Sequence, residues 1–283
     1  MSDELDSYDY VIVGGGTAGC LLANRLSERP DVRVLLIEAG GNDRNFLFHW
    51  PAGFAKMTKG IASWGWSTVP QKHMKDRVFW YTQAKVIGGG STINAQIYTR
   101  GNALDYDGWA QAGCAGWSYR EVLPYFKRAE DNDSFGEPYH GRGGPLAVSR
   151  PRATLPICEA FFEAAAKLGM PRNTDFAGAK PDGVGYYQLT QKNVRRSSTV
   201  TAYLKPARAR PNLTVLLARQ VNRVVVERGR AVGVELVERG SPAPVRISAD
   251  REVIVSAGAI GSPHILQLSG IGPAATLKDA GIP

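Results

Sequence analysis

The residues with the clearest chemical potential lie in the first forty positions. Gly14, Gly16 and Gly19 follow an apolar run that ends at Val13, at the spacing of a dinucleotide-binding loop. In such a loop the first glycine makes a tight turn, the second lets the backbone approach a diphosphate, and the third lets a helix lie close to the sheet. Backbone N–H groups and the positive end of the helix dipole then face the diphosphate. The pattern predicts a phosphate-binding turn.

Glu38 supplies the second half of this pattern. It stands nineteen residues after Gly19, at the end of the apolar run 34–37, where its carboxylate can accept hydrogen bonds from a ribose diol. A glycine turn that only packs a helix against a sheet does not explain a carboxylate at this position. We therefore expect a dinucleotide site, and this motif alone is compatible with NAD or FAD.

The other reactive side chains suggest no second chemistry. No two histidines have metal-ligand spacing, and the three cysteines are too few and too far apart for a disulfide framework or a zinc site. The sequence also has no GxSxG serine elbow and no Walker-type loop. The four histidines are His49, His73, His140 and His264, and the three cysteines are Cys20, Cys114 and Cys158. We expect Cys20 to be a small apolar residue within the first helix and expect no metal.

The whole chain sets the frame for this site. Its 283 residues, 43% of them hydrophobic, suffice for about two domains. The start is acidic and polar, and no stretch approaches the roughly 18 apolar residues of a membrane span, which favours a cytoplasmic protein. The net charge of +8 is densest over 195–210 without interleaved aromatics, which favours a solvated basic face or attraction for an anionic cofactor over nucleic-acid binding.

Hydrophobic patterns predict the elements that position the loop. Residues 10–13 and 34–38 read as strands joined by a helix. A second glycine cluster, 84–94, joins another apolar run to a helix and suits the other end of a dinucleotide. The segment between Glu38 and Lys85 reads as an irregular cover over the nucleotide sheet.

Later segments predict packing elements and one more ligand-facing strand. A capping box at 118–121 opens a helix to about residue 130, although Pro124 lies beyond its first turn. Residues 213–236 read as an antiparallel meander, and 252–258 as a buried parallel strand whose end meets a ligand. A packing helix over 154–169 has its apolar face at Ile157, Phe161, Ala164 and Leu168. A short helix is expected to begin at Ser262-Pro263.

Three ordered motifs, at 14–19, 84–107 and 258–272, together resemble the glucose-methanol-choline (GMC) oxidoreductase family. The resemblance implies an α/β fold: a Rossmann-like FAD-binding domain with an incomplete α+β substrate domain. It assigns 7–145 and 198–283 to the FAD-binding domain and 146–197 to the first part of the substrate domain. It also implies FAD-dependent oxidation of the CH–OH group of an alcohol, with hydride transfer to the flavin.

The same resemblance implies cofactor roles for seventeen residues. They are Gly14, Gly16, Thr17, Ala18 and Gly19 at the diphosphate, Glu38 and Ala39 at the ribose, Val86, Gly90, Ser91, Asn94, Ala95, Gln96 and Ile97 in the second loop along the flavin, Val221 at the adenine, and Ala257 and Gly258 beside the cofactor. Taken alone, Asn94 reads as a helix cap after a glycine turn. Within the full motif the flavin role is favoured.

Departures from the family pattern limit what the resemblance implies. Ile93 stands where some relatives carry the histidine that bonds covalently to flavin, so we expect non-covalent FAD. Gln96 replaces a common methionine near the flavin edge, which leaves the alcohol open. The family's catalytic histidine is expected beyond Pro283, in a longer protein. The electron acceptor, oxygen or a quinone-type carrier, stays open.

Two other functions remain compatible with the sequence. The chain can be an FAD-binding fragment without turnover, in which the cofactor loops work and the base is missing. It can also be an NAD-dependent dehydrogenase, although the second glycine loop argues against this alternative.

Overall fold

The computed structural model describes residues 7–57, 60–237 and 244–282. The chain divides into two compact units, residues 1–93 with 198–283, and residues 94–197. Residues 94–145, which the sequence analysis places in the FAD-binding domain, fall in the second unit. The functional division into domains therefore stays a prediction.

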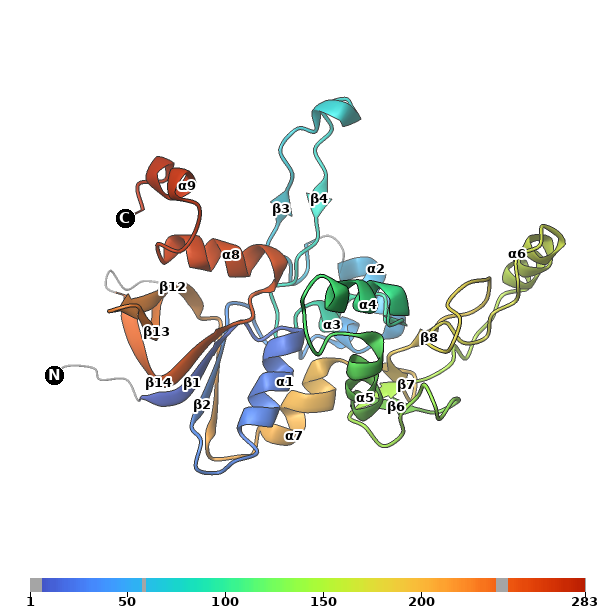
Figure 1. Cartoon of the computed structure of the whole chain (residues 1–283), viewed down its shortest axis with the longest axis horizontal. Helices are drawn as coiled ribbons and strands as arrows, with labels where there is room; N and C mark the ends of the chain where they lie inside the picture. Colours follow the sequence, from blue (N-terminus) through green and yellow to red (C-terminus); the bar gives the residue numbers. More distant parts are fainter. Residues whose placement is uncertain (1–6, 58–59, 238–243, 283) are drawn as a thin grey trace. The chain divides into compact units, whose positions relative to one another are not determined.

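The first unit is built on a mixed sheet (Figure 1). Within the described residues it has six strands in the order β11-β2-β1-β14-β13-β12, parallel from β11 to β14 and antiparallel from β14 to β12. The strands of this unit are β1 (Tyr8–Val13), β2 (Val34–Glu38), β3 (Trp66–Ser67), β4 (Trp80–Tyr81), β11 (Leu213–Leu217), β12 (Gln220–Glu227), β13 (Arg230–Val237) and β14 (Val245–Val255).

Helices and single turns complete the first unit. They are α1 (Thr17–Leu26), α2 (Phe54–Met57), α3 (Gly90–Ile93), α7 (Lys205–Ala207), α8 (Gly258–Leu268), α9 (Ala274–Asp279), the turns η1 (Phe46–Phe48), η2 (Pro51–Gly53) and η3 (Lys72–Met74), and the π-helical turn η4 (Val200–Leu204). The helix expected after the second glycine cluster is thus the single turn α3. Among the described residues, no helix is both long and apolar enough to span a bilayer.

The two predicted strands at the start of the chain are confirmed as β1 and β2. Their side chains alternate between two apolar clusters, with Ile12 and Leu36 in one and Val11 and Leu35 in the other. All four are fully buried, as expected for parallel strands covered on both faces. This burial holds the ends of the strands, and therefore the glycine turn and Glu38, in fixed positions.

Cys20 confirms its expected structural role. It lies in α1 with no exposed surface, and its thiol donates to the Gly15 carbonyl oxygen at 3.2 Å. Burial raises the pKa of this thiol to about 12. The side chain is therefore a packing group and not a nucleophile.

Three expectations for the first unit are corrected. β11 does not belong to the meander, because it pairs in parallel with β2, on the opposite side of the sheet from β12 and β13. α8 begins at Gly258, and Pro263 lies within it. The segment 39–85 covers the sheet only in part, since β3 and β4 rise away from it (Figure 1) and Val69 between them is 75% exposed.

The second unit combines three helices with short strand pairs in the described residues. Its elements are β5 (Ile97–Tyr98), α4 (Ala103–Gln111), α5 (Tyr119–Ala129), β6 (Glu130–Asn132), β7 (Leu146–Val148), α6 (Pro156–Lys167), β8 (Gln188–Leu189), β9 (Gln191–Lys192) and β10 (Arg195–Arg196). The predicted capping box is confirmed at Ser118 and Glu121, and α5 continues through Pro124.

The predicted packing face of α6 is wrong. Ile157 and Phe161 are 71% and 63% exposed, whereas Phe162 and Ala165 are buried. The helix carries apolar side chains on two adjacent faces, so the spacing of one face could not show which of them the fold covers.

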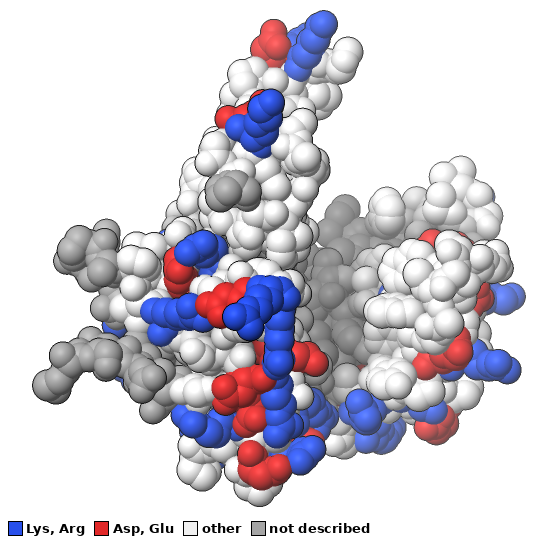
Figure 2. Space-filling view, turned by 60° about the vertical axis from the view of Figure 1, so that its left-hand side comes forward, with Lys and Arg blue, Asp and Glu red and all other residues white. Residues whose placement is uncertain are grey.

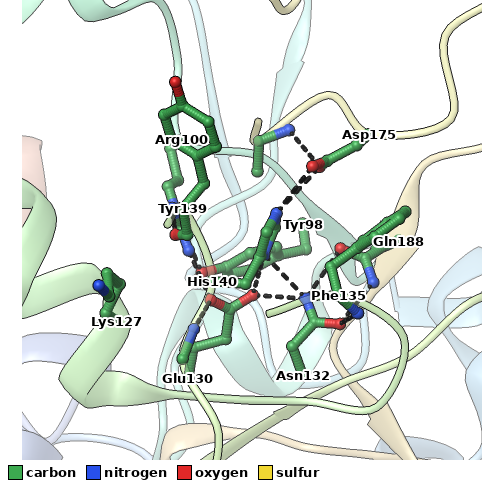
Figure 3. A network of polar contacts seen from close by, with 12 residues as sticks. Tyr98, Arg100, Lys127, Glu130, Asn132, Phe135, Tyr139, His140, Asp175 and Gln188 are labelled. Carbon is green, nitrogen blue, oxygen red and sulfur yellow. Dashed lines mark hydrogen bonds and ion pairs between the residues drawn. The ribbon is translucent and has the colours of Figure 1, made fainter. Parts of the chain in front are cut away.

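A network of charged and polar side chains lies inside the second unit (Figure 3). Glu130 is fully buried and accepts from Arg100, from Asn132 at 2.7 Å and from the Gly141 N–H at 3.0 Å. His140 joins it, with Nδ1 2.9 Å from Glu130 and Nε2 3.0 Å from Asp175. The network connects segments that are separated by long stretches of sequence.

Charges of both signs share the surface that Figure 2 shows, so lysines and arginines do not form one continuous patch there. Exposed ion pairs include Arg29 with Asp31 at 2.7 Å and Arg223 with Glu235 at 2.7 Å. Within the basic stretch 195–210, Arg195 is exposed whereas Arg196 is buried, so the interpretation of that stretch as a solvated face stays a prediction.

Candidate functional site

A cavity of about 770 Å³ opens in the first unit where β1, β2 and β14 end. In open α/β sheets ligands bind at the carboxyl ends of the strands. Ten of the seventeen predicted residues line this cavity: Gly14, Gly16, Thr17, Ala18, Glu38, Ala39, Gly90, Val221, Ala257 and Gly258. Gly19, Val86 and Ser91 belong to the same unit without lining the cavity, and residues 94–97 belong to the second unit.

Two glycines of the turn are required by the fold itself. Gly14 has φ +99°, and a Cβ added there would lie 2.7 Å from the Ser256 carbonyl oxygen. A Cβ added at Gly19 would lie 2.0 Å from the Gly14 carbonyl oxygen. Because neither glycine has a Cβ, α1 and the end of β14 can approach the turn closely. The Ser256 hydroxyl also donates to the Gly14 carbonyl oxygen at 2.8 Å.

Two other glycines leave space that the protein does not fill. A Cβ at Gly16 would have its nearest neighbour at 3.9 Å, and one at Gly90 would have none within 4 Å. Both positions line the cavity. We predict that a ligand approaches the backbone at these two positions, and a dinucleotide diphosphate fits this requirement.

The N-termini of two helices meet this cavity. α1 begins after Gly16 and α8 after Ala257, and in the described residues neither has a side-chain cap or an acidic residue in its first turn. Their first backbone N–H groups are therefore available, and both helix dipoles place positive charge at the cavity. The arrangement suits an anionic ligand.

Glu38 is held in place by backbone donors on both sides. Oε2 accepts from the Gly15 N–H at 2.8 Å, and Oε1 accepts from the Gly40 N–H at 2.7 Å. Burial raises the pKa of this carboxyl, while the N–H groups of Gly40 and Gly15 oppose the rise. Each carboxylate oxygen keeps a second lone pair, so Glu38 can still accept from a ribose diol.

The cavity lining also contains residues that sequence reasoning did not place in the site. Trp64 and Trp66 line the cavity with their rings stacked at 5.3 Å, and Lys85 Nζ lies 4.2 Å from the centre of the Trp64 ring. His264 on α8 also lines it.

The second unit holds residues 94–97 in a defined turn. Asn94 and Ala95 are exposed, whereas Gln96 is 1% exposed and has φ +67°. The Gln96 side-chain oxygen accepts from Gln191 Nε2 at 2.6 Å. Its amide therefore bonds within the unit, and an effect of Gln96 on the flavin edge stays a prediction.

Residues 8–280 match the GMC oxidoreductase family. This chain belongs to that family. The GMC chain is 42% identical over 277 residues to an alcohol dehydrogenase (acceptor) of Pseudomonas putida, covering 97% of this chain and 50% of the relative. It is also 42% identical over 290 residues to the mitochondrial choline dehydrogenase of Homo sapiens, covering 100% of this chain and 48% of the relative.

This GMC chain also matches solved structures of oxidoreductases. The crystal structure of pyridoxine 4-oxidase from Mesorbium loti matches with a TM-score of 0.92 and 38% identity, over 98% of this chain and 54% of that one. An FAD-dependent oxidoreductase from Chaetomium thermophilum matches with a TM-score of 0.92 and 34% identity. The expected α/β, Rossmann-like architecture is confirmed. The chain spans about half the length of the curated relatives it matches.

Proposed function

We propose that this chain is the FAD-binding part of an oxidoreductase that acts on the CH–OH group of an alcohol. The observation that carries the proposal is the cavity at the carboxyl edge of the sheet, where Glu38 and the open backbone at Gly16 meet two helix N-termini. Family membership and the names of the relatives support it. FAD, when bound, would supply the acceptor for a hydride from the carbinol carbon.

The residues of the chain divide the work of holding FAD. The N–H groups of Thr17 and Ala18 bind the diphosphate, Glu38 binds the ribose, and the backbone of Val221 meets the adenine. Residues 94–97 contact the flavin. The second glycine loop, with Val86, Gly90 and Ser91, and the start of α8, with Ala257 and Gly258, contribute further backbone contacts.

We propose that FAD is held non-covalently. Ile93 is 7% exposed and belongs to the apolar cluster that includes Val200, and its side chain offers no nucleophile. Acid precipitation of the loaded protein should therefore leave the flavin in the supernatant. Flavin recovered in the protein pellet would show a covalent bond and exclude this arrangement.

We also propose a cytoplasmic location, an alcohol substrate, and oxygen or a quinone-type carrier as acceptor. Three cysteines without a disulfide pattern fit a reducing compartment. Fractionation of the source cells tests the location.

Mixing reduced, loaded full-length protein with oxygen or with a quinone tests the acceptor, since the faster reoxidation identifies the partner.

Ligand titration tests the central proposal against its alternatives. FAD should bind and show a bound-flavin spectrum, whereas NAD should bind at least about tenfold more weakly, because it offers no flavin to the second loop. Preferential NAD binding would overturn the proposal in favour of a nicotinamide dehydrogenase. Flavin binding without reduction by any alcohol, in a protein of full family length, would favour a binding module without turnover.

A further inference from the structure

Four residues in the second unit are connected around the turn at 94–96 by side-chain hydrogen bonds and by backbone pairing. Asn94 Oδ1 accepts from Arg196 at 2.6 Å and from the Gln96 backbone N–H at 3.1 Å. Gln96 accepts from Gln191 at 2.6 Å, and Gln191 pairs with Arg196 across the β9–β10 ladder. The set joins the turn to a hairpin about one hundred residues away in sequence.

Arg196 is built into this set. It is 3% exposed, and its strand is fixed by the pairing of β10 with β9 and by a hydrogen bond from the Ser197 N–H to the Thr190 carbonyl oxygen at 2.9 Å. Thr190 in turn donates its backbone N–H to the Gln96 carbonyl oxygen at 2.8 Å. Burial lowers the pKa of Arg196 to about 10, so the guanidinium is still a charged donor at neutral pH.

The Arg196 guanidinium and the Gln96 backbone N–H determine which end of the Asn94 amide faces outward. Because Oδ1 accepts from Arg196 and from the turn, the carboxamide cannot rotate without losing both bonds. Asn94 is exposed, and among the described residues Nδ2 has no hydrogen-bond partner. Asn94 therefore offers hydrogen-bond donors, and not an acceptor, to a ligand.

We propose that Arg196 is a positioning residue that orients the Asn94 carboxamide so that its Nδ2 donates to an acceptor atom of the flavin ring. The inference rests on the proposed function, because it takes the flavin as the ligand of residues 94–97. It extends that function by assigning a role to a residue on a distant strand.

Comparing FAD with ADP tests the proposal, since ADP has the diphosphate and adenosine but no flavin ring. We expect Arg196→Met to weaken FAD binding to this chain about 3- to 10-fold, the effect of one hydrogen bond, and to shift the bound-flavin absorption bands. ADP binding should not change. Arg196→Lys, which keeps a charged donor, should recover part of the loss. Arg195→Met, on the same strand with an exposed side chain, is the matched control and should change neither ligand.

A double variant shows whether Arg196 acts through Asn94. Asn94→Ala should weaken FAD binding by a similar factor, and adding Arg196→Met should weaken it no further. If ADP still binds, two results would overturn the inference. One is an unchanged FAD affinity in Arg196→Met, and the other is a double variant whose loss of FAD affinity equals the sum of the two single losses in free energy. If the unmodified chain does not bind ADP, the proposed dinucleotide site itself is rejected.

Discussion

Glu38 is held by the fold in the position where we propose that it binds the ribose. Its two oxygens accept from Gly15 and Gly40 at the end of β2, which orients the carboxylate before any ribose arrives. Preorganisation of this kind reduces the ordering cost of binding.

Replacement of Glu38 by alanine should weaken FAD binding by about 1 to 3 kcal/mol, because ribose hydroxyls in a closed site lose a charged acceptor. Titration of FAD into both proteins measures the change. Glu252→Ala, an exposed carboxylate on β14, is the control and should bind FAD normally. An unchanged affinity in Glu38→Ala would remove Glu38 from the site.

The glycines of the turn should separate into two classes. Gly19→Ala places a Cβ 2.0 Å from a carbonyl oxygen and should destabilise the free chain by about 2 kcal/mol or more. Gly16→Ala meets nothing closer than 3.9 Å, so its free energy of unfolding should stay within about 0.5 kcal/mol of wild type. FAD affinity should nevertheless fall at least about tenfold in Gly16→Ala, because the methyl group occupies the diphosphate approach.

Chemical unfolding and FAD titration of the two variants provide the measurements. A Gly16→Ala variant that binds FAD as tightly as wild type would show that the diphosphate does not approach this position. A stable Gly19→Ala variant would show that α1 can move away from the turn without cost.

At the scale of elements, the second unit is held together by charge as well as by apolar packing. Arg100 follows β5, Glu130 begins β6, and Asp175 lies in the segment after α6, so His140 and its partners connect three parts of the chain (Figure 3). Breaking a buried ion pair from one side leaves an uncompensated charge. The network should therefore control the stability of the elements that carry residues 94–97.

Unfolding of the chain should depend on the protonation of His140. Burial alone would lower its pKa, but the hydrogen bonds with Asp175 and Glu130 raise it to about 9. Since the ordinary pKa is 6.5, this stabilisation is complete below that pH and is lost as pH rises through 9. The free energy of unfolding should fall by up to about 3 kcal/mol over this range.

Urea unfolding between pH 6.5 and 9.5 measures this decline. His140→Gln should be less stable than wild type at pH 7 and should lose most of the alkaline dependence. His73→Gln, an exposed histidine in η3, should keep the wild-type profile. A wild-type curve that is flat through pH 9 would show that His140 is not charged in the folded chain.

At the scale of the whole molecule, we predict that cofactor binding can be separated from catalysis. The cavity and the glycine turn lie within these residues, and the chain spans about half the length of the curated relatives it matches. Of the described histidines, His140 is held protonated between two carboxylates at neutral pH and so cannot accept a proton. His264 is the histidine that lines the cavity.

We therefore expect this chain, loaded with FAD, to show no anaerobic flavin reduction by primary alcohols. General base catalysis contributes about 10² to 10⁴-fold, and a positioned base is needed as the hydride leaves. A relative of full family length, assayed in parallel, should be reduced. Rapid reduction of the short chain that His264→Ala abolishes would place the base on α8 and contradict this expectation.

The sequence by itself determined the features that depend on local backbone geometry. The glycine spacing, the strands that end at Val13 and Glu38 and the capping box at Ser118 all follow from neighbouring residues, because turns, caps and strand periodicity are local properties. The tertiary structure decided which distant residues meet. It determined which face of α6 is buried and that Trp64 lines the cavity. It also determined that Arg196 donates a hydrogen bond to Asn94. Such contacts depend on how the elements pack, and packing is not encoded in the spacing of any one segment.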